Sequence, residues 1–244
     1  MANPIKVKAV VSNIQSYGDG VYELLITPES IVPRYKAGQF LHLTVDPYDP
    51  AGGFWPESRV FSIANSWGSE YIKIVYSIKG RYTSYMEKTL KVGSEVWLKL
   101  PYGDFVIQNV LEKYEHVVLI AGGTGISPFL PFLEQQIKDN TLKNKVHLFY
   151  GVRKNTHIIA IDVLNNSVKA GVKTQVFTEL EEPRKDVLFN ISKGRLDIKS
   201  ITDKVEIEKP VYFLSGPPIM IANFKECMIS NGISNDRICI DEWE

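Results

Sequence analysis

The segment from His116 to Pro128 constrains the fold more than any other part of this sequence. Residues 116–121 are an apolar, β-branched run with the length of a buried strand, and glycines follow at 122, 123 and 125. Pro128 suits the first position of a helix, and apolar residues at helical spacing continue to Lys138. A strand, a tight turn and a helix in this order predict one unit of a parallel α/β sheet.

The same segment is a candidate pyrophosphate site. Its glycines allow a ligand to approach the backbone closely, and the free N–H groups at a helix N-terminus attract phosphate. The pattern is neither G-x-G-x-x-G nor the lysine-bearing P-loop, and a glycine turn after a strand is often only a tight turn. Alone, the segment therefore leaves nucleotide binding and a plain turn both open.

The sequence pattern changes near residue 110, which predicts two domains, 1–110 and 111–244. Short β-rich segments separated by glycine turns are typical of an antiparallel β-barrel, and strands that alternate with helices predict a parallel sheet covered on both faces. We expect barrel strands at 6–14, 21–27, 39–45, 59–63, 71–77 and 95–99, with one helix at 83–90. We expect a parallel five-stranded sheet with strands at 116–121, 145–151, 173–178, 211–215 and 237–240, and helices at 128–139, 159–169, 197–202 and 218–230.

Composition narrows the function classes. Lys and Arg together number 28, as do Asp and Glu, so the zero net charge gives no reason to expect a nucleic-acid partner. No apolar run is long enough to span a bilayer and the first residues lack a signal-peptide pattern, so a cytoplasmic location is expected. Cys227 and Cys239 are expected to be buried thiols and are too few for the four thiolates of a [2Fe–2S] cluster. The four histidines show no ligand spacing, so no metal site is expected.

Two further segments give the glycine turn a family context. Upstream lies Arg59-Val60-Phe61-Ser62-Ile63-Ala64-Asn65, and downstream lies Leu214-Ser215-Gly216-Pro217-Pro218-Ile219-Met220. In this order the three segments resemble the ferredoxin–NADP reductase superfamily, which carries an Arg-x-Tyr-Ser flavin motif, a Gly-Gly-Thr-Gly-x-Thr/Ser-Pro nucleotide motif and a Cys-Gly-Pro-Pro-x-Met motif. The resemblance spans nearly the whole chain. Within the superfamily, the chain is similar to the reductase components of bacterial oxygenases, without their iron–sulfur domain.

The resemblance implies an FAD site on the barrel. Arg59 would bind a phosphate, Phe61 would pack against the ribityl-flavin, and Ser62 would lie near flavin N5. Thr83 is expected to be the N-cap of a helix whose preceding turn binds the pyrophosphate, which favours FAD over FMN. Phe61 stands where the family has Tyr, and the missing hydroxyl removes a hydrogen bond of roughly 0.5–1.5 kcal/mol. The predicted flavin-binding residues are Arg59, Val60, Phe61, Ser62, Tyr76, Gly80, Arg81, Tyr82, Thr83 and Trp243.

The resemblance also implies an NAD(P)H site at the carboxyl edge of the parallel sheet. Ser215 stands where the family has a cysteine near nicotinamide C4, and the exchange is expected to affect the rate of hydride transfer more than the type of reaction. Glu179 would repel a 2′-phosphate and accept a hydrogen bond from a free ribose hydroxyl, so NADH is favoured over NADPH unless Arg153, Arg184 and Lys185 compensate. The predicted nucleotide-binding residues are Gly122, Gly123, Thr124, Gly125, Ser127, Pro128, Gly151, Arg153, Glu179, Gly216, Pro217 and Met220.

The implied reaction is hydride transfer from NADH or NADPH to flavin N5, followed by electron transfer to a separate iron–sulfur, haem or oxygenase protein. Asp241 and Trp243 match the family's Glu-x-Phe ending, and Trp243 is expected either to lie over the isoalloxazine or to cap the sheet edge. The predicted catalytic residues are Ser62, Ser215, Asp241 and Trp243. Two alternatives stay open: a reductase of free flavin or ferric complexes, and a flavin- or nucleotide-binding electron-transfer subunit or regulator.

Overall fold

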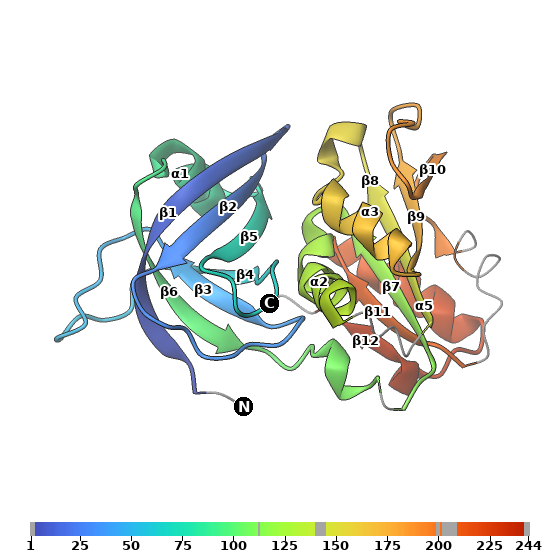
Figure 1. Cartoon of the computed structure of the whole chain (residues 1–244), viewed down its shortest axis with the longest axis horizontal. Coiled ribbons are helices and arrows are strands. Elements are labelled where there is room, and N and C mark those ends of the chain that lie inside the picture. The colour runs from blue at the N-terminus through green and yellow to red at the C-terminus, as the bar shows by residue number, and fades with distance from the viewer. Residues whose placement is uncertain (1–2, 112, 140–144, 199–200, 202–208, 242–244) are drawn as a thin grey trace.

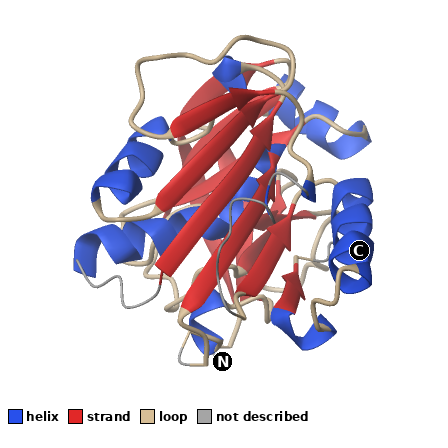
Figure 2. Ribbon diagram, turned by 90° about the vertical axis from the view of Figure 1, so that its right-hand side faces the viewer, coloured by secondary structure: helices blue, strands red, loops and turns tan. Residues whose placement is uncertain are grey.

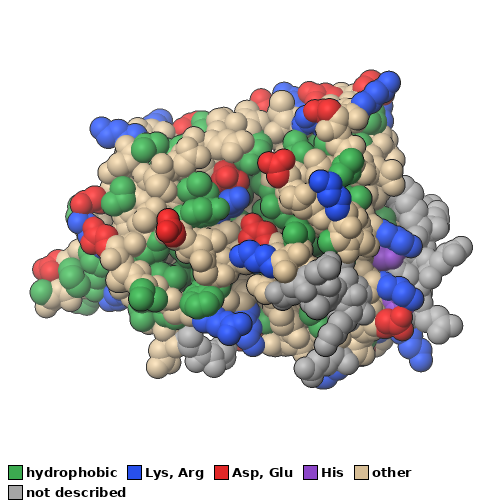
Figure 3. All heavy atoms as spheres, viewed as in Figure 1, with side chains coloured by type: hydrophobic (Ala, Val, Ile, Leu, Met, Phe, Trp, Pro, Cys, Tyr) green, Lys and Arg blue, Asp and Glu red, His purple; other side chains and the backbone are tan. Residues whose placement is uncertain are grey.

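Two halves of the chain lie side by side in the computed structural model, which describes residues 3–111, 113–139, 145–198, 201 and 209–241. Figure 1 shows an antiparallel barrel on one side and a layered α/β unit on the other. Lys and Arg side chains are interspersed with Asp and Glu over the face shown in Figure 3, in keeping with their equal numbers. Within the described part of the chain, every helix is too short or too polar to cross a membrane.

The barrel is a six-stranded antiparallel sheet. Its strands are β1 (Ile5–Gly18), β2 (Val21–Pro28), β3 (Phe40–Thr44), β4 (Arg59–Ser62), β5 (Ile72–Ser77) and β6 (Glu95–Tyr102). Their order is β4-β3-β6-β1-β2-β5. Just beyond the end of β4, the N–H of Ala64 donates to the carbonyl of Lys73 on β5 at 2.8 Å, so the sheet is nearly closed. Helix α1 (Arg81–Thr89) buries Tyr82 and Met86 in the barrel core.

The second half is a parallel sheet with helices on both faces (Figure 2). Its strands are β7 (His116–Gly122), β8 (Lys145–Val152), β9 (Lys173–Thr178), β10 (Asn190–Lys193), β11 (Val211–Ser215) and β12 (Ile238–Ile240), in the order β10-β9-β8-β7-β11-β12. Its α-helices include α2 (Leu130–Asp139), α3 (Ile161–Lys169) and α5 (Pro218–Ser230). This arrangement confirms the predicted fold class.

The structure corrects the predicted strand count and one predicted helix start. The parallel sheet has six strands instead of five, because β10 is short and lacks the apolar run that marked the others. Residues Gly123–Phe129 form a 3-10 helix, η2, so the α-helix expected from Pro128 begins only at Leu130. The helix expected at 197–202 lies partly outside the described residues.

The start of α1 also differs from the prediction. The helix begins at Arg81, with Gly80 in the N-cap position, so Thr83 is not the N-cap. Thr83 instead lies in the first turn, where its hydroxyl oxygen accepts hydrogen bonds from the N–H groups of Lys79 (2.9 Å) and Gly80 (3.2 Å). The side chain still stabilises the start of the helix, from inside the helix.

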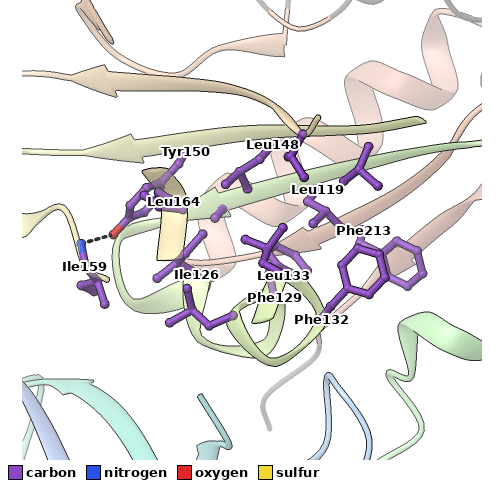
Figure 4. Close-up of a cluster of buried hydrophobic side chains, with 14 of the residues drawn as sticks. Leu119, Ile126, Phe129, Phe132, Leu133, Leu148, Tyr150, Ile159, Leu164 and Phe213 are labelled. Carbon is purple, nitrogen blue, oxygen red and sulfur yellow. Dashed lines mark hydrogen bonds between the residues drawn. The ribbon is translucent and has the colours of Figure 1, made fainter. Parts of the chain in front are cut away.

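One buried cluster joins the two halves. Ala37, Ala64, Val75 and Ile107 from the barrel half belong to the same apolar cluster as the core between the parallel sheet and helices α2 and α3. Figure 4 shows the centre of that cluster, with Phe129, Phe132 and Leu133 facing Leu119 and Phe213 of the sheet. Since the halves share a core, packing fixes how one half is positioned against the other.

Candidate functional site

A cavity of about 730 Å³ lies between the barrel and the carboxyl edge of the parallel sheet, within the size range of small-molecule sites. Residues from both halves line it. The sequence-predicted residues that line it are Gly122, Gly123, Thr124, Gly151, Arg153, Glu179, Pro217 and Met220. The observed cavity therefore coincides with the predicted nucleotide site at eight of its twelve residues.

Strand register brings the glycine turns together. β7 is the neighbour of both β8 and β11, with Gly122 opposite Gly151 and Ala121 opposite Ser215. The turns that follow these parallel strands consequently meet at one edge of the sheet. This edge is where ligands of open α/β sheets bind.

The glycines of these turns are required by close packing. A Cβ atom on Gly122 would lie 2.7 Å from Met220 Sδ, and one on Gly125 would lie 2.4 Å from the carbonyl oxygen of Ser215. Gly216 has φ of 155° and approaches Gly122 N so closely that a Cβ would lie 3.0 Å from it. Any side chain at these positions would push the turns apart and change the shape of the cavity.

Gly125, Ser127, Pro128 and Gly216 support the cavity from behind and are not among its lining residues. Gly125, Ser127 and Pro128 are buried, and the Ser127 hydroxyl donates to the carbonyl of Thr124 at 2.7 Å. This bond holds the turn that presents Thr124 to the cavity. These buried residues therefore hold the shape of the turn and do not face the cavity.

Two predicted catalytic residues contact each other. Ser215 and Asp241 are both buried, and the Ser215 hydroxyl donates to Asp241 Oδ2 at 2.9 Å. The N–H of Asp241 in turn donates to the carbonyl of Leu214, which anchors the carboxylate beside the end of β11. The Ser215 hydroxyl is thus held in one orientation by Asp241. Trp243 lies outside the described residues.

A carboxylate and two arginines surround the far end of the cavity. Glu179 follows β9, and its N–H donates to the carbonyl of Val152 at 3.0 Å. Arg195 Nε lies 3.7 Å from Glu179 Oε1, and Arg153 lines the same cavity. Sequence reasoning missed Arg195 because it follows β10, the polar strand that the hydrophobic pattern did not reveal. Arg184 is bound to Asp186 at 2.7 Å and is not among the lining residues.

The barrel supplies one wall of the cavity, and the sequence had not predicted this contribution. Asp19, Val21, Ser77, Ile78 and Lys79 line it. Asp19 lies in the β1–β2 turn and pairs with Lys154 Nζ at 2.7 Å, and this ammonium group holds the pKa of Asp19 below its usual range. The pairing ties the barrel to the loop after β8. The sequence signal for this turn is Gly18-Asp19-Gly20, which predicts a turn but not its contact with the other half of the chain.

Within the described part of the chain, the predicted flavin residues lie on β4, on β5, at the N-cap Gly80 and on α1. Arg59 is exposed on β4, and its guanidinium carbon lies 4.7 Å from the ring centre of Tyr82. Phe61 is buried and packs against the ring of Tyr76 at a centroid distance of 6.0 Å. Val60 is half-buried and Ser62 is buried. The β5–α1 connection runs from this group into the cavity wall, so the two candidate sites are continuous along the chain.

The hydroxyl of Tyr82 is occupied by the protein itself. It accepts a hydrogen bond from the N–H of Val45 (3.2 Å) and lies 3.1 Å from the carbonyl of Leu43. Tyr82 is buried and the guanidinium group of Arg59 lies over its ring. Arg59, rather than Tyr82, would therefore contact a flavin directly.

The donor groups fit a pyrophosphate. Arg59 and Arg81 already hold a carboxylate, that of Glu57, at 2.8 and 3.3 Å. The first turn of α1 leaves N–H groups without intrahelical acceptors beside them. A Cβ on Gly80 would meet no atom within 4 Å, so the space in front of this turn is open. Two cationic forks and a helix N-terminus are the groups that bind phosphates in proteins.

The chain is similar in sequence to known oxidoreductases. Residues 119–226 match the family described as oxidoreductase NAD-binding domain. The chain is 25% identical over 253 residues to the reductase component of propane 2-monooxygenase from Rhodococcus jostii, covering 97% of this chain and 63% of the relative. It is 30% identical over 166 residues to the NAD(P)H-flavin reductase of Vibrio harveyi, covering 65% of each.

The fold also matches solved structures. A ferredoxin NADP+ reductase from Neisseria gonorrhoeae, crystallised with FAD and NADP, superposes with a TM-score of 0.76 at 18% identity and covers 98% of both chains. At that identity the likeness concerns the fold alone. The chain spans less than two thirds of the length of both relatives from Rhodococcus and Vibrio.

Proposed function

Because this chain has the two-domain fold of the ferredoxin–NADP reductase superfamily and carries an oxidoreductase NAD-binding domain, we propose that it is an FAD-dependent oxidoreductase. It would take hydride from NAD(P)H and pass electrons to a separate protein. The observation that carries this proposal is the shared cavity, in which the glycine turns of the sheet face the β5–α1 segment of the barrel. The proposed domain limits are 1–110 for the flavin domain and 111–244 for the nucleotide domain.

The barrel residues would hold the flavin. Arg59, Arg81 and the first turn of α1 would bind its pyrophosphate, while Phe61 and Tyr76 would pack against its apolar part. When bound, the flavin supplies hydride acceptance and one-electron release. The protein needs no general acid or base for this, because its residues bind and orient the two cofactors.

The sheet residues would hold the pyridine nucleotide. The turn at Gly122–Thr124 would accept the pyrophosphate, since a Cβ on Gly123 would meet no atom within 4 Å and the backbone there is accessible. Ser215, fixed by Asp241, would position the nicotinamide ring from behind, with its proton directed away from the ring toward the carboxylate. A fixed hydroxyl there limits the orientations in which the nicotinamide can bind.

NADH would be the preferred nucleotide. Glu179 places a negative charge at the end of the cavity where the adenine ribose would lie, and a 2′-phosphate would be repelled there. Arg153 and Arg195 reduce this repulsion, and Arg195 is already paired with Glu179. The expected selectivity for NADH is therefore modest.

The electron acceptor would be a protein of the iron–sulfur, haem or oxygenase class. The similarity to an oxygenase reductase component supports this class, and the similarity to an NAD(P)H-flavin reductase supports free flavin as an alternative acceptor. A non-enzymatic subunit or regulator would instead bind flavin that NADH does not reduce.

An anaerobic titration tests the proposal. The protein is loaded with FAD, freed of excess flavin and titrated with NADH and, separately, with NADPH. Loss of the oxidised flavin absorbance on stoichiometric NADH is the expected result, with a weaker response to NADPH. Flavin that stays oxidised with both nucleotides would favour the subunit or regulator, and failure to retain or bind FAD would overturn the flavin assignment.

A further inference from the structure

The two arginines of the candidate phosphate site share one carboxylate. Arg59 Nη2 lies 2.8 Å from Glu57 Oε1, and Arg81 Nη2 lies 3.3 Å from Glu57 Oε2. Each oxygen of the carboxylate therefore faces a different guanidinium group. A phosphate group would present two oxygens to the same pair of forks.

The backbone of Glu57 is anchored while its side chain is accessible. Its carbonyl oxygen lies 3.2 Å from the hydroxyl of the buried Tyr82, the residue after Arg81 on α1. Two residues before Glu57, Trp55 donates through its indole N–H to the hydroxyl of Ser58 at 3.0 Å. The side chain of Glu57 is 43% exposed and can rotate into solvent without moving the loop.

We propose that Glu57 is an internal competitor of the flavin phosphate: its carboxylate occupies the subsite of Arg59 and Arg81 and must leave when FAD binds. The inference rests on the proposed function. Displacement breaks two ion pairs and leaves a negative charge close to the incoming pyrophosphate. FAD should therefore bind more weakly than the two arginines would otherwise allow, and exchange more readily.

The competition should depend on the phosphate and not on the ring system. Riboflavin has no phosphate, so its binding would leave Glu57 in place. Replacing the carboxylate by an amide should tighten FAD binding by about three- to thirtyfold, as expected for two exposed ion pairs, and leave riboflavin binding unchanged.

The test measures dissociation constants for FAD and riboflavin from the change in flavin fluorescence during titration with flavin-free protein. Glu57→Gln is compared with wild type and with the control Glu95→Gln. The control changes the net charge by the same amount but removes a different ion pair, the one between Glu95 and Lys8 at 2.6 Å. Glu57→Ala is a second variant. Its side chain has no polar group, so it cannot form a hydrogen bond with Arg59 or Arg81, as the glutamine amide could. Thermal unfolding of each variant checks that it is folded.

The inference predicts tighter FAD binding for both Glu57 variants, with Glu95→Gln and all riboflavin affinities unchanged. If wild type binds FAD and both Glu57 variants bind it equally or more weakly, the inference is overturned and the proposed function stands. The inference is equally overturned if Glu95→Gln tightens FAD binding as much as Glu57→Gln. If neither wild type nor any variant binds FAD, the proposed function itself is overturned.

Discussion

Single atoms at the sheet edge decide whether the two glycine turns can meet. Gly125 lies against the carbonyl of Ser215, and Ser215 in turn is bound to Asp241. The Ser215 hydroxyl makes a defined hydrogen bond at this point. Packing at this point links the turn after β7 to the turn after β11. A substitution in one turn should therefore shift the backbone of the other.

Replacing Gly125 by Ala should destabilise the protein and weaken NADH binding together. The new Cβ would lie 2.4 Å from the Ser215 oxygen and 2.6 Å from Gly216 Cα, and backbone atoms cannot rotate away. We expect a loss of about 1–3 kcal/mol in the free energy of unfolding, measured by urea denaturation. Gly52→Ala is the control, because its Cβ would meet no atom within 4 Å. Equal stability of both variants would contradict the packing argument.

Removing the charge of Glu179 should shift the nucleotide preference toward NADPH. Glu179→Gln removes repulsion of a 2′-phosphate and removes the carboxylate that lies beside Arg195. The ratio of kcat/KM for NADPH over NADH should rise by about five- to tenfold, or roughly 1 kcal/mol. The control is Glu182→Gln, whose carboxylate pairs with Lys193 and is 77% exposed. An unchanged ratio in Glu179→Gln would show that Glu179 does not face the ribose.

Strand β8 illustrates how one element combines two roles. Its carboxyl end brings Gly151 to the cavity, where a Cβ would lie 2.8 Å from Leu196 Cβ. Near its amino end, His147 is 7% exposed, and burial lowers its pKa to about 4. The charges of Lys173 on β9 and His116 on β7 act in the same direction. The strand therefore carries a neutral imidazole at neutral pH.

Burial of His147 should make the protein less stable as the pH falls. The unfolded chain takes up a proton near the ordinary pKa of 6.5, whereas the folded protein resists protonation until about pH 4. Between these values the free energy of unfolding should fall by up to about 1.4 kcal/mol per pH unit from this group. His147→Gln should reduce that slope in urea denaturation series from pH 7 to pH 4.5. Parallel curves for variant and wild type would contradict the assignment.

At the scale of the whole molecule, the halves are joined by apolar packing and by polar contacts. Phe105, which follows the last barrel strand, packs edge-on against Phe213 of β11 at a centroid distance of 5.5 Å. A polar contact also joins the halves, because Glu134 of α2 accepts a hydrogen bond from the N–H of Ser66 in the barrel half at 2.6 Å. Such a junction predicts that barrel and sheet unfold together.

Phe105→Ala should weaken both halves at once. It removes ring contacts to Phe213 and Phe129, and for a half-buried ring we expect a loss of about 2–3 kcal/mol. Native-state hydrogen exchange should show equal loss of protection in β1 and β6 of the barrel and in β7 and β11 of the sheet. Phe54→Ala is the matched control, because Phe54 is 98% exposed. Loss of protection in one half alone would show that the halves unfold independently.

Local signals along the chain were enough to predict the fold class, which the structure confirms, and a family resemblance with which the comparisons agree. Buried strands such as β7 and β11 are marked by apolar runs that end at glycine, so their positions follow from neighbours along the chain. The same local signals located the glycine turns that line the cavity. The domain limits and the roles of the individual site residues remain predictions.

The residues that share the cavity could not be predicted from local signals, because they are brought together by packing. The tertiary structure added β10 and Arg195, moved the start of α1 to Arg81, and placed Asp19 and Lys79 of the barrel in the cavity wall. It also brought Ser215 to Asp241, across 26 residues of sequence. Hydrophobic periodicity reports which face of an element is buried, but not which distant element buries it. That choice depends on strand register and on the core shared by the two halves, which are properties of the packed chain.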